Sequence, residues 1–389
     1  MHGYALLAAV FAAPALAQEV NSTYMAGLAS ALNSAGLTSL VGVVQGISNN
    51  TNGTALLAQL SQGQKTVFAP NNAAFSAVPG DVSSNANRLV SILSYHVVDG
   101  HLNASDFATS PSHTIARTFL NNSEFVMLEG GRSQVIVAER ASNGTVTILE
   151  ATRNTTVLNS TTYENLIVHA VDHVLAMPDD ISDTVEDAGL SSLDGALDST
   201  DLDDVLERAH GITIFAPTNA AFQSALASLG GQAQNNTVIS AILANHVING
   251  TSVYSTGLTA NSYSSAGGQP FSFSSNSSGN YITSGSSSAR IVRADIPVEN
   301  GVMHLIDNVL ANTASDPGAA ASAVASQSSV AATATSIPGQ SAGGSGPAPS
   351  GSPSNSASLR TAGTLPGTAV ILSVAAAAIG AFLGGMLVF

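Results

Sequence analysis

The sequence predicts an α+β protein built from two tandem copies of one domain. The first observation is a near repeat of ten residues, "TVFAPNNAAF" at 66–75 and "TIFAPTNAAF" at 213–222. The second is that further matched segments accompany this pair in the same order in both halves. The third is a change of period inside each half, from helical spacing of apolar residues to short strands separated by turns. Helices followed by antiparallel strands favour the α+β class.

The matched segments define the two copies. They pair residues 24–37 with 191–202, 92–100 with 242–250, and 164–176 with 299–311. Together with the ten-residue repeat they make four blocks in register, which indicates a duplication. We therefore expect domain 1 at residues 20–178 and domain 2 at 181–312, each near the common domain size.

Local signals predict the elements of each copy. In domain 1 a short strand ends at Pro70, and Asn71 is the expected N-cap of the next helix. Pro217 and Thr218 have the same roles in domain 2. The segments "RLVSILSYHVVDG" and "VISAILANHVING" are predicted helices that end at Gly100 and Gly250. Short strands with turns are expected over residues 124–159 and 271–296.

Composition limits the function classes. The chain has 389 residues and no cysteine, which excludes disulfides and thiolate metal sites, so each domain must be held together by its own core. Lysine and arginine number 10 against 25 aspartate and glutamate, a formal net charge of −15. This charge disfavours nucleic acid and anionic membranes as partners.

Both ends of the chain carry targeting patterns. Residues 1–17 are predicted as a signal peptide cut before Gln18, although this segment has no lysine or arginine. Residues 367–389 form an uncharged hydrophobic tail. With a polar spacer and small residues at Asn355, this is the layout of a glycosylphosphatidylinositol (GPI) signal, and a single-pass anchor is the alternative. The Ser/Ala/Gly/Pro-rich segment 313–366 is expected to be a flexible stalk.

Sequons for N-glycosylation agree with export. They are confined to the region between the two targeting segments. The candidates are Asn21, Asn49, Asn52, Asn103, Asn121, Asn143, Asn154, Asn159, Asn235, Asn249 and Asn276.

The repeated segments resemble the fasciclin domain family. The ten-residue pair is similar to its first signature box, "YHVVDG" and "NHVING" to its central segment, and "NLIVHAVDHVLAMP" and "NGVMHLIDNVLAN" to its second box. The resemblance implies a β-sandwich wedge with packed helices, and a role in cell adhesion or matrix contact without a catalytic site. It marks as structural Phe68, Pro70, Phe75, Tyr95, His96, His169, Phe215, Pro217, Phe222, His246 and His304.

The two copies depart from the family pattern in different places. Asn245 stands where Tyr95 stands in domain 1. Adhesive relatives carry an Asp-Ile pair before the second box, and Asp295-Ile296 fits that position, whereas domain 1 has Ser160-Thr161 there. The resemblance therefore makes Asp295 and Ile296 the candidate adhesion contact. The alternative is that Asp295 caps a turn and Ile296 fills the edge of the core.

The sequence gives only weak indications of a catalytic or metal-binding site. His96 and His246 fall on the apolar face of a helix and are expected to be buried and hydrogen-bonded. "HAVDH" (169–173) has a spacing that invites a metal, but Ala170 stands where a zincin helix needs glutamate. The acidic cluster 198–204 lacks the glycine and the final glutamate of a calcium loop. We expect no catalytic, metal or cofactor site.

The leading functional prediction is a cell-surface adhesion protein, or one that contacts the matrix or the cell wall. The alternatives are a glycan-binding cell-wall module and, less favoured, a secreted hydrolase. Expected partners are surface or matrix proteins or glycans, a homophilic contact, and the membrane through a lipid anchor. The expected location is the extracellular face of the plasma membrane or the cell wall.

Overall fold

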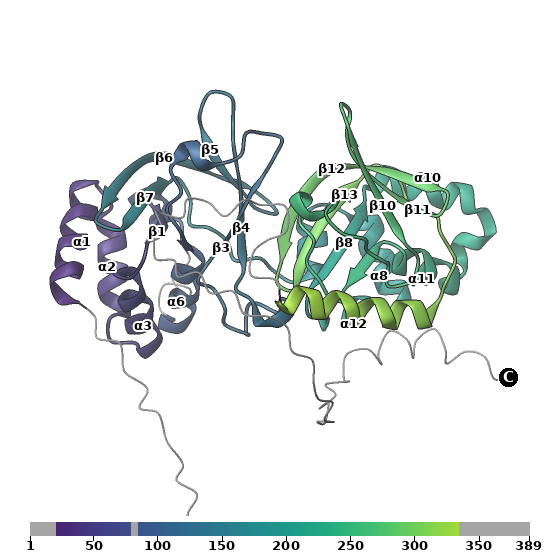
Figure 1. Ribbon diagram of the computed structural model, residues 1–389, viewed down its shortest axis with the longest axis horizontal. Helices are drawn as coiled ribbons and strands as arrows, with labels where there is room; N and C mark the ends of the chain where they lie inside the picture. The colour runs from purple at the N-terminus through teal and green to yellow at the C-terminus, as the bar shows by residue number, and fades with distance from the viewer. Residues whose placement is uncertain (1–20, 79–84, 334–389) are drawn as a thin grey trace, which may run out of the picture.

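The computed structural model describes residues 21–78 and 85–333 (Figure 1). The ribbon shows two bodies of similar build side by side, each a sheet with helices packed on it. Helix α12 (Pro317–Thr333) runs along the second body toward the first. The expected signal peptide, Asn355 and the hydrophobic tail lie outside the described residues. Within the described part, no helix has the length and apolar character needed to cross a bilayer.

Domain 1 contains a seven-stranded sheet in the order β2-β1-β7-β6-β5-β4-β3. Among these neighbours, β1 and β7 pair in parallel beside the edge strand β2, and the other pairs are antiparallel. The strands are β1 (Lys65–Pro70), β2 (Val97–Asp99), β3 (Thr114–Arg117), β4 (Val135–Arg140), β5 (Val146–Leu149), β6 (Asn154–Tyr163) and β7 (Leu166–Val171).

Four of the five described α-helices of domain 1 begin at asparagine caps. The Asn71 side chain accepts a hydrogen bond from Ala74 N directly after β1, which confirms the predicted cap. Asn21, Asn50 and Asn85 cap other helices in the same way. The helices are α1 (Ser22–Ser34), α2 (Thr38–Ile47), α3 (Thr51–Leu60), α4 (Asn72–Ser76), α6 (Ala86–Tyr95), and the 3₁₀ turns η1 (Ala104–Asp106) and η2 (Glu129–Gly131).

Domain 2 repeats this topology with six strands in the order β10-β11-β12-β13-β8-β9. The pair β8 and β13, beside the edge strand β9, is again parallel. The strands are β8 (Ile212–Pro217), β9 (Val247–Asn249), β10 (Phe271–Asn276), β11 (Gly279–Ser284), β12 (Ser287–Val298) and β13 (Gly301–Ile306). The helices are α7 (Ile181–Asp187), α8 (Ser191–Thr200), α9 (Asp203–Glu207), α10 (Asn219–Leu229), α11 (Asn236–Ala244), η3 (Gly230–Gln234) and η4 (Ser255–Gly257). The predicted α+β class is confirmed.

A fully buried phenylalanine lies at the centre of each core. Phe68 has no exposed surface, and its ring packs against Phe107 and His169 with centroids 6.4 and 5.5 Å away. In domain 2, Phe215 is equally buried and stacks on His304 with centroids 5.4 Å apart. The strand of the first signature segment therefore carries the residue around which each core packs.

The prediction of a flexible stalk is wrong for residues 317–333, which form α12. This segment is rich in alanine, the strongest helix former, and it packs against η2 of domain 1. Gln327 fixes it to domain 2, because its amide donates to Asn249 O at 2.8 Å and accepts from Ser264 N at 3.2 Å. The rest of the expected stalk, residues 334–366, lies outside the described part.

Two glycines make room for α12 and for the segment that leads into it. Gly250 has φ 89°, and a Cβ there would clash with Ser328. Gly268 has φ 80°, and a Cβ there would clash with the backbone of Asp316. Positive φ and close backbone approach are both conditions that glycine alone meets easily. The docked position of α12 is therefore encoded in domain 2.

We predict that Phe68→Ala and Phe215→Ala each destabilise the chain by about 3–5 kcal/mol, the usual cost of emptying a phenylalanine site in a core. Chemical denaturation of each variant measures this. Phe75→Ala is the matched control in the same signature segment, because Phe75 is only partly buried and its loss costs less. Unfolding curves for Phe68→Ala and Phe215→Ala that overlay the parent curve would contradict the core role.

Candidate functional site at the domain interface

The predicted adhesion contact is buried. Asp295 is 1% exposed and Ile296 is 2% exposed, so neither side chain is available to an external partner. The register between β12 and β13 shifts between Arg293 and Ile296, and Asp295 has φ 60°. This irregularity places Asp295 against domain 1, while Ile296 fills the core of domain 2. The prediction of a surface contact at this pair is therefore wrong.

Asp295 instead joins the two domains. Its Oδ2 lies 2.7 Å from Nδ1 of His113 in domain 1. Its Oδ1 accepts from Ser255 N at 2.6 Å, and the Ser255 hydroxyl donates to Oδ2. Burial alone would raise the pKa of this carboxyl, but the His113 hydrogen bond and the charges of His304 and His113 hold the pKa of Asp295 below its usual value. The carboxylate therefore remains charged inside the interface.

Further bonds extend the interface on both sides of Asp295. The buried Gln134 amide donates to Val298 O at 3.0 Å. Backbone bonds join Met127 N to Glu299 O at 3.0 Å and Gly211 N to Met127 O at 3.1 Å. An apolar cluster of residues from both domains packs between them, formed by Ile115, Val135, Val137, Tyr254 and Val302. The two domains are thus joined by a buried interface that combines polar and apolar contacts.

The matching position of domain 1 has no such role. Ser160 is exposed on β6, and its hydroxyl lies 2.7 Å from Nδ1 of His169. His169 Nε2 lies 2.8 Å from Leu102 O. In domain 2, His304 makes the equivalent pair of bonds, with Asp295 N and Val253 O. Both histidines thus tie a loop to the sheet, but only in domain 2 does the opposite residue reach across to the other domain.

His96 and His246 are core histidines. Nδ1 of each lies within 2.8 Å of a backbone oxygen one helical turn earlier, at Ile92 and Ile242. Because a carbonyl only accepts, Nδ1 carries the proton and Nε2 accepts from the backbone, at Leu175 N or Leu310 N. Burial lowers the pKa of both imidazoles to about 4. The predicted buried, hydrogen-bonded state is confirmed.

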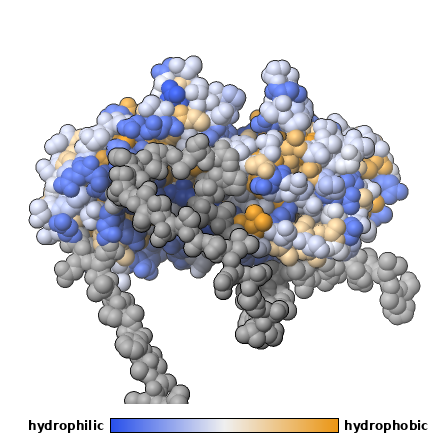
Figure 2. Space-filling model, viewed as in Figure 1, coloured by the Kyte–Doolittle hydropathy of each residue, from blue (hydrophilic) through white to orange (hydrophobic). Residues whose placement is uncertain are grey.

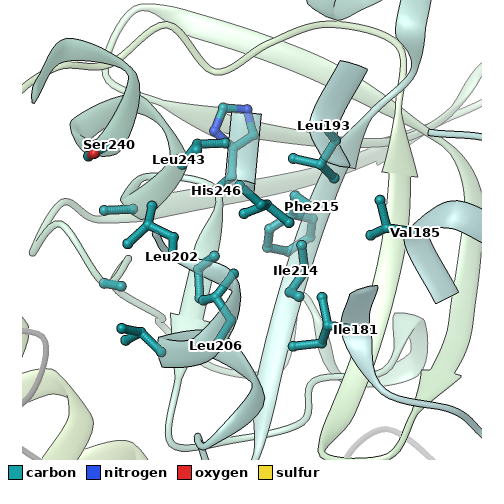
Figure 3. A pocket seen from close by; sticks show the side chains of 15 residues that line it. Ile181, Val185, Leu193, Leu202, Leu206, Ile214, Phe215, Ser240, Leu243 and His246 are labelled. Atoms are coloured by element: carbon teal, nitrogen blue, oxygen red, sulfur yellow. The ribbon is translucent and has the colours of Figure 1, made fainter. Parts of the chain in front are cut away.

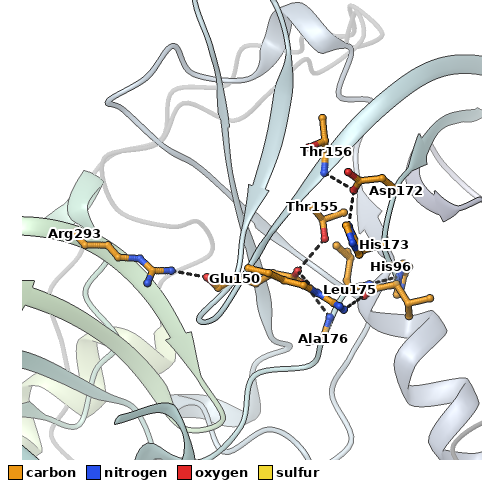
Figure 4. A network of polar contacts seen from close by, with 11 residues as sticks. His96, Glu150, Thr155, Thr156, Asp172, His173, Leu175, Ala176 and Arg293 are labelled. Atoms are coloured by element: carbon orange, nitrogen blue, oxygen red, sulfur yellow. Dashed lines mark hydrogen bonds and ion pairs between the residues drawn. The ribbon is translucent and has the colours of Figure 1, made fainter. Parts of the chain in front are cut away.

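The polar groups near His96 are also used internally (Figure 4). The Glu150 carboxylate accepts from Thr155 Oγ1 at 2.9 Å and from Ala176 N at 2.7 Å, and burial raises its pKa. Its backbone oxygen accepts from Arg293 of domain 2 at 2.5 Å. In the "HAVDH" segment, His173 pairs with Asp172, away from His169. The described residues contain no cluster of three or more metal-ligating side chains.

Each domain also has a small apolar cavity between its helices and its sheet. In domain 2 it has a volume of about 50 Å³, and Figure 3 shows Ile214, Phe215 and His246 among its lining. Domain 1 has a cavity of about 50 Å³ in the same place, beside Phe68 and His96. Each is too small for more than a water or two, at roughly 30 Å³ per water, and neither offers a reactive group. They are packing gaps rather than ligand sites.

Ten of the eleven sequon asparagines are exposed. Asn249 is the exception, because it is 8% exposed and lies beneath α12, where Gln327 binds its backbone oxygen. The folded chain has no room for a glycan on Asn249, so this candidate is withdrawn. Of the exposed asparagines, eight belong to domain 1, and Asn235 and Asn276 belong to domain 2.

The sequence did not reveal the interface residues His113, Gln134 and Tyr254. It also did not reveal Glu129, whose carboxylate accepts from the Ser252 hydroxyl of domain 2 at 2.8 Å. A signal existed in the comparison of the two copies. Leu102 N and Val253 N donate to matching threonines, so the next residues, Asn103 and Tyr254, occupy equivalent positions. Asn103 is a sequon residue and Tyr254 is a large aromatic residue. This difference indicates that the position of Tyr254 is covered by another part of the chain.

We predict that stability falls as the pH drops from 6.5 to 4, because His96 and His246 are protonated in the unfolded chain but stay neutral in the folded one. Each contributes a loss of roughly 2 kcal/mol at pH 5 and about 3 kcal/mol below pH 4. NMR titration of the imidazoles with melting curves at each pH checks this. Titration of either residue near pH 6.5 would contradict it.

Comparison with known proteins agrees with this architecture. The model of the fasciclin domain matches residues 25–178 and 188–312. A fasciclin-like arabinogalactan protein of Arthroderma benhamiae is 28% identical over 255 residues, 63% of this chain and 58% of that protein. The immunogenic protein MPB70 of Mycobacterium bovis is 36% identical over 136 residues, 29% of this chain and 66% of that protein. The chain thus spans less than two thirds of the length of either relative.

A structural neighbour is the FAS1 domain pair of the insect cell adhesion molecule fasciclin I. It is 20% identical with a TM-score of 0.36, and the match covers 72% of this chain and 97% of that one. The family model alone covers well over half of the chain, and it matches both copies. The chain therefore belongs to the fasciclin domain family.

Proposed function

We propose that the protein is a GPI-anchored adhesion protein of the cell surface that contacts matrix or cell-wall components through domain 2. The observation that carries the proposal is the family match over both domains, since fasciclin-like proteins are associated with adhesion and the cell wall. The family's homologues are adhesion or structural proteins rather than enzymes. The internal use of His96, His169, His246 and His304 is in keeping with that.

The proposed anchor and location rest on the sequence and on one relative. The uncharged tail after residue 366, the spacer and Asn355 have the GPI layout. The fungal relative's name places it among arabinogalactan proteins, which supports an extracellular or cell-wall location for this chain. The expected signal peptide and the exposed sequons are in keeping with export.

The distribution of exposed sequons is the reason for choosing domain 2. Glycans on the eight sites of domain 1 would cover much of that domain, whereas domain 2 offers two sites over a comparable surface. On the face in Figure 2, outside the grey atoms, hydrophobic residues form small scattered patches, more of them over domain 2. A single contact made by such small patches is weak. Many anchored copies gain avidity of roughly 10² to 10⁴ over one site.

Masking with new glycans tests this proposal. Ser286→Asn creates the sequon Asn-Ser-Ser in the exposed turn between β11 and β12, and Asp198→Asn creates Asn-Ser-Thr on α8. The matched control in domain 1 is Ala35→Ser, which turns exposed Asn33 into a sequon. The full chains are displayed at equal surface levels, and the cells held under flow on a layer of matrix or cell wall are counted.

We expect a several-fold loss of bound cells for at least one domain 2 variant and none for Ala35→Ser. Phosphatidylinositol-specific phospholipase should release the parent protein and abolish binding. A loss of bound cells with Ala35→Ser alone would show that the contact lies in domain 1 instead. Parent cells that bind no better than cells without the protein would contradict the adhesion role, and resistance to the phospholipase would contradict the anchor.

A further inference from the structure

A groove in domain 1 lies between α3, α6 and residues 119–124. Helices α3 and α6 lie side by side (Figure 1), and the Asn50 amide before α3 donates to Asn87 Oδ1 of α6 at 2.8 Å. The volume of the groove is about 540 Å³, within the range of ligand-binding pockets and roughly ten times that of either apolar gap. It therefore has room for a ligand, whereas the apolar gaps do not.

Each helix lines the groove with one face, two turns long. The spacing in both helices is i, i+3, i+4 and i+7, which places the four residues on one stripe of about 10 Å. The residues of α3 are Asn52, Ala55, Leu56 and Gln59, those of α6 are Asn87, Val90, Ser91 and Ser94, and the third wall is Phe119, Leu120, Asn121, Asn122 and Glu124.

This lining is polar but almost uncharged, although the chain has a net charge of −15. Glu124 is the single charged residue among the described residues that line it, whereas five of them are asparagine or glutamine. Leu56, Val90 and Phe119 add apolar surface between the polar groups. Amides beside apolar surface suit a neutral ligand that carries both hydrogen-bonding groups and CH groups, as a sugar does.

Several of the amides are available to a ligand. The side chains of Asn52, Gln59 and Asn121 are exposed, and none of them has a hydrogen-bond partner within the described part of the chain. The Asn87 side chain accepts from Asn50 through its oxygen, so its two N–H donors stay open. A ligand can therefore replace water on these groups without breaking a bond inside the protein.

Two of the same amides are predicted attachment sites for N-glycans. Asn52 begins the sequon Asn-Gly-Thr on α3, and Asn121 begins Asn-Asn-Ser on the third wall. A glycan on either asparagine starts at the edge of the groove. Because the link is covalent, the effective concentration of its first sugars beside the groove is high, and contacts that are weak for a free sugar are then made.

We propose that this groove holds the first sugars of the chain's own N-glycans, attached to Asn52 and Asn121. An N-glycan begins with two N-acetylglucosamine units, whose hydroxyl and acetamido groups bond the amides of Gln59 and Asn87. Their CH and methyl groups pack on the apolar surface at Leu56. The bound sugars tie α3, α6 and residues 119–124 together. The proposal rests on the export and N-glycosylation that belong to the proposed function, but not on adhesion.

The test uses the full chain from a host that attaches N-glycans, purified in a non-ionic detergent, with site occupancy measured by mass spectrometry. Asn52→Gln with Asn121→Gln removes both glycans, and Gln59→Ala removes one available amide, alone and in the glycan-free double variant. The control is Asn159→Gln, because Asn159 is exposed on β6 and does not line the groove. The melting temperature is measured, and so is the rate at which an endoglycosidase cuts each native glycan between its first two sugars.

We expect both sites to be occupied, and the double variant to melt about 2–4 °C below the parent, since several hydrogen bonds to the sugars are lost. Asn159→Gln should melt with the parent. Gln59→Ala should lower the melting temperature of the glycosylated chain but not that of the double variant. It should also speed the release of the glycans on Asn52 and Asn121 several-fold and leave that on Asn159 unchanged.

Three results would each overturn the proposal: Asn52 and Asn121 without glycans, equal melting of the double variant and the parent, or a Gln59→Ala effect that is the same with and without these glycans. Free di-N-acetylchitobiose tests an external source, and it should raise the melting temperature of the double variant alone. A rise for the parent as well would show that the groove is open to other glycans, against the proposal. None of these results bears on adhesion, because cell binding is not measured.

Discussion

The arrangement of the two domains depends on one buried carboxylate. Asp295 leaves the regular course of β12 through a left-handed backbone conformation and contacts His113 of the other domain. A charge in that position is tolerated only because His113 and both donors of Ser255 satisfy it. Removal of one partner from such a buried pair typically costs about 3–5 kcal/mol. The apolar cluster around Tyr254 and the backbone bonds of Met127 also join the two domains.

Three of the positions where the two copies differ are places where they meet each other or fix the chain that leads to α12. Ser160 of domain 1 is exposed, whereas its counterpart Asp295 bridges the domains. Asn103 is an exposed sequon, whereas Tyr254 is buried in the interface. Tyr95 donates to Val135 O inside domain 1.

Its counterpart Asn245 instead fixes the chain that leads to α12, because its amide donates to Asn312 O and Ala314 O at 2.9 and 2.8 Å. Asn245 departs from the family pattern, and this change holds the chain that leads to α12 against domain 2. The duplicated fold has thus been kept in the cores and changed at the contacts that turn two domains into one body.

The sequence predicted the cores well and the interface poorly, for a physical reason. The strands around Phe68 and Phe215, the cap at Asn71 and the state of His96 follow from local periodicity and from residue chemistry within a few positions. The position of Asp295 follows from a strand irregularity and from a partner 182 residues away, and neither leaves a local pattern. The helix at 317–333 was missed because low apolar content indicated disorder, whereas its docking relies on Gln327 and on glycines of domain 2.

The most direct test of this account is the distance between the domains in solution. Because the chain has no cysteine, spin labels can be placed at Ser34→Cys on α1 and Ser228→Cys on α10, both exposed, and the distance measured by pulsed electron paramagnetic resonance. The account predicts one narrow distance distribution for the parent and for the control Ser160→Ala, and a broad one for Asp295→Ala. A broad distribution in the parent, or an unchanged narrow one in Asp295→Ala, would contradict the claim that Asp295 fixes the two domains as one body.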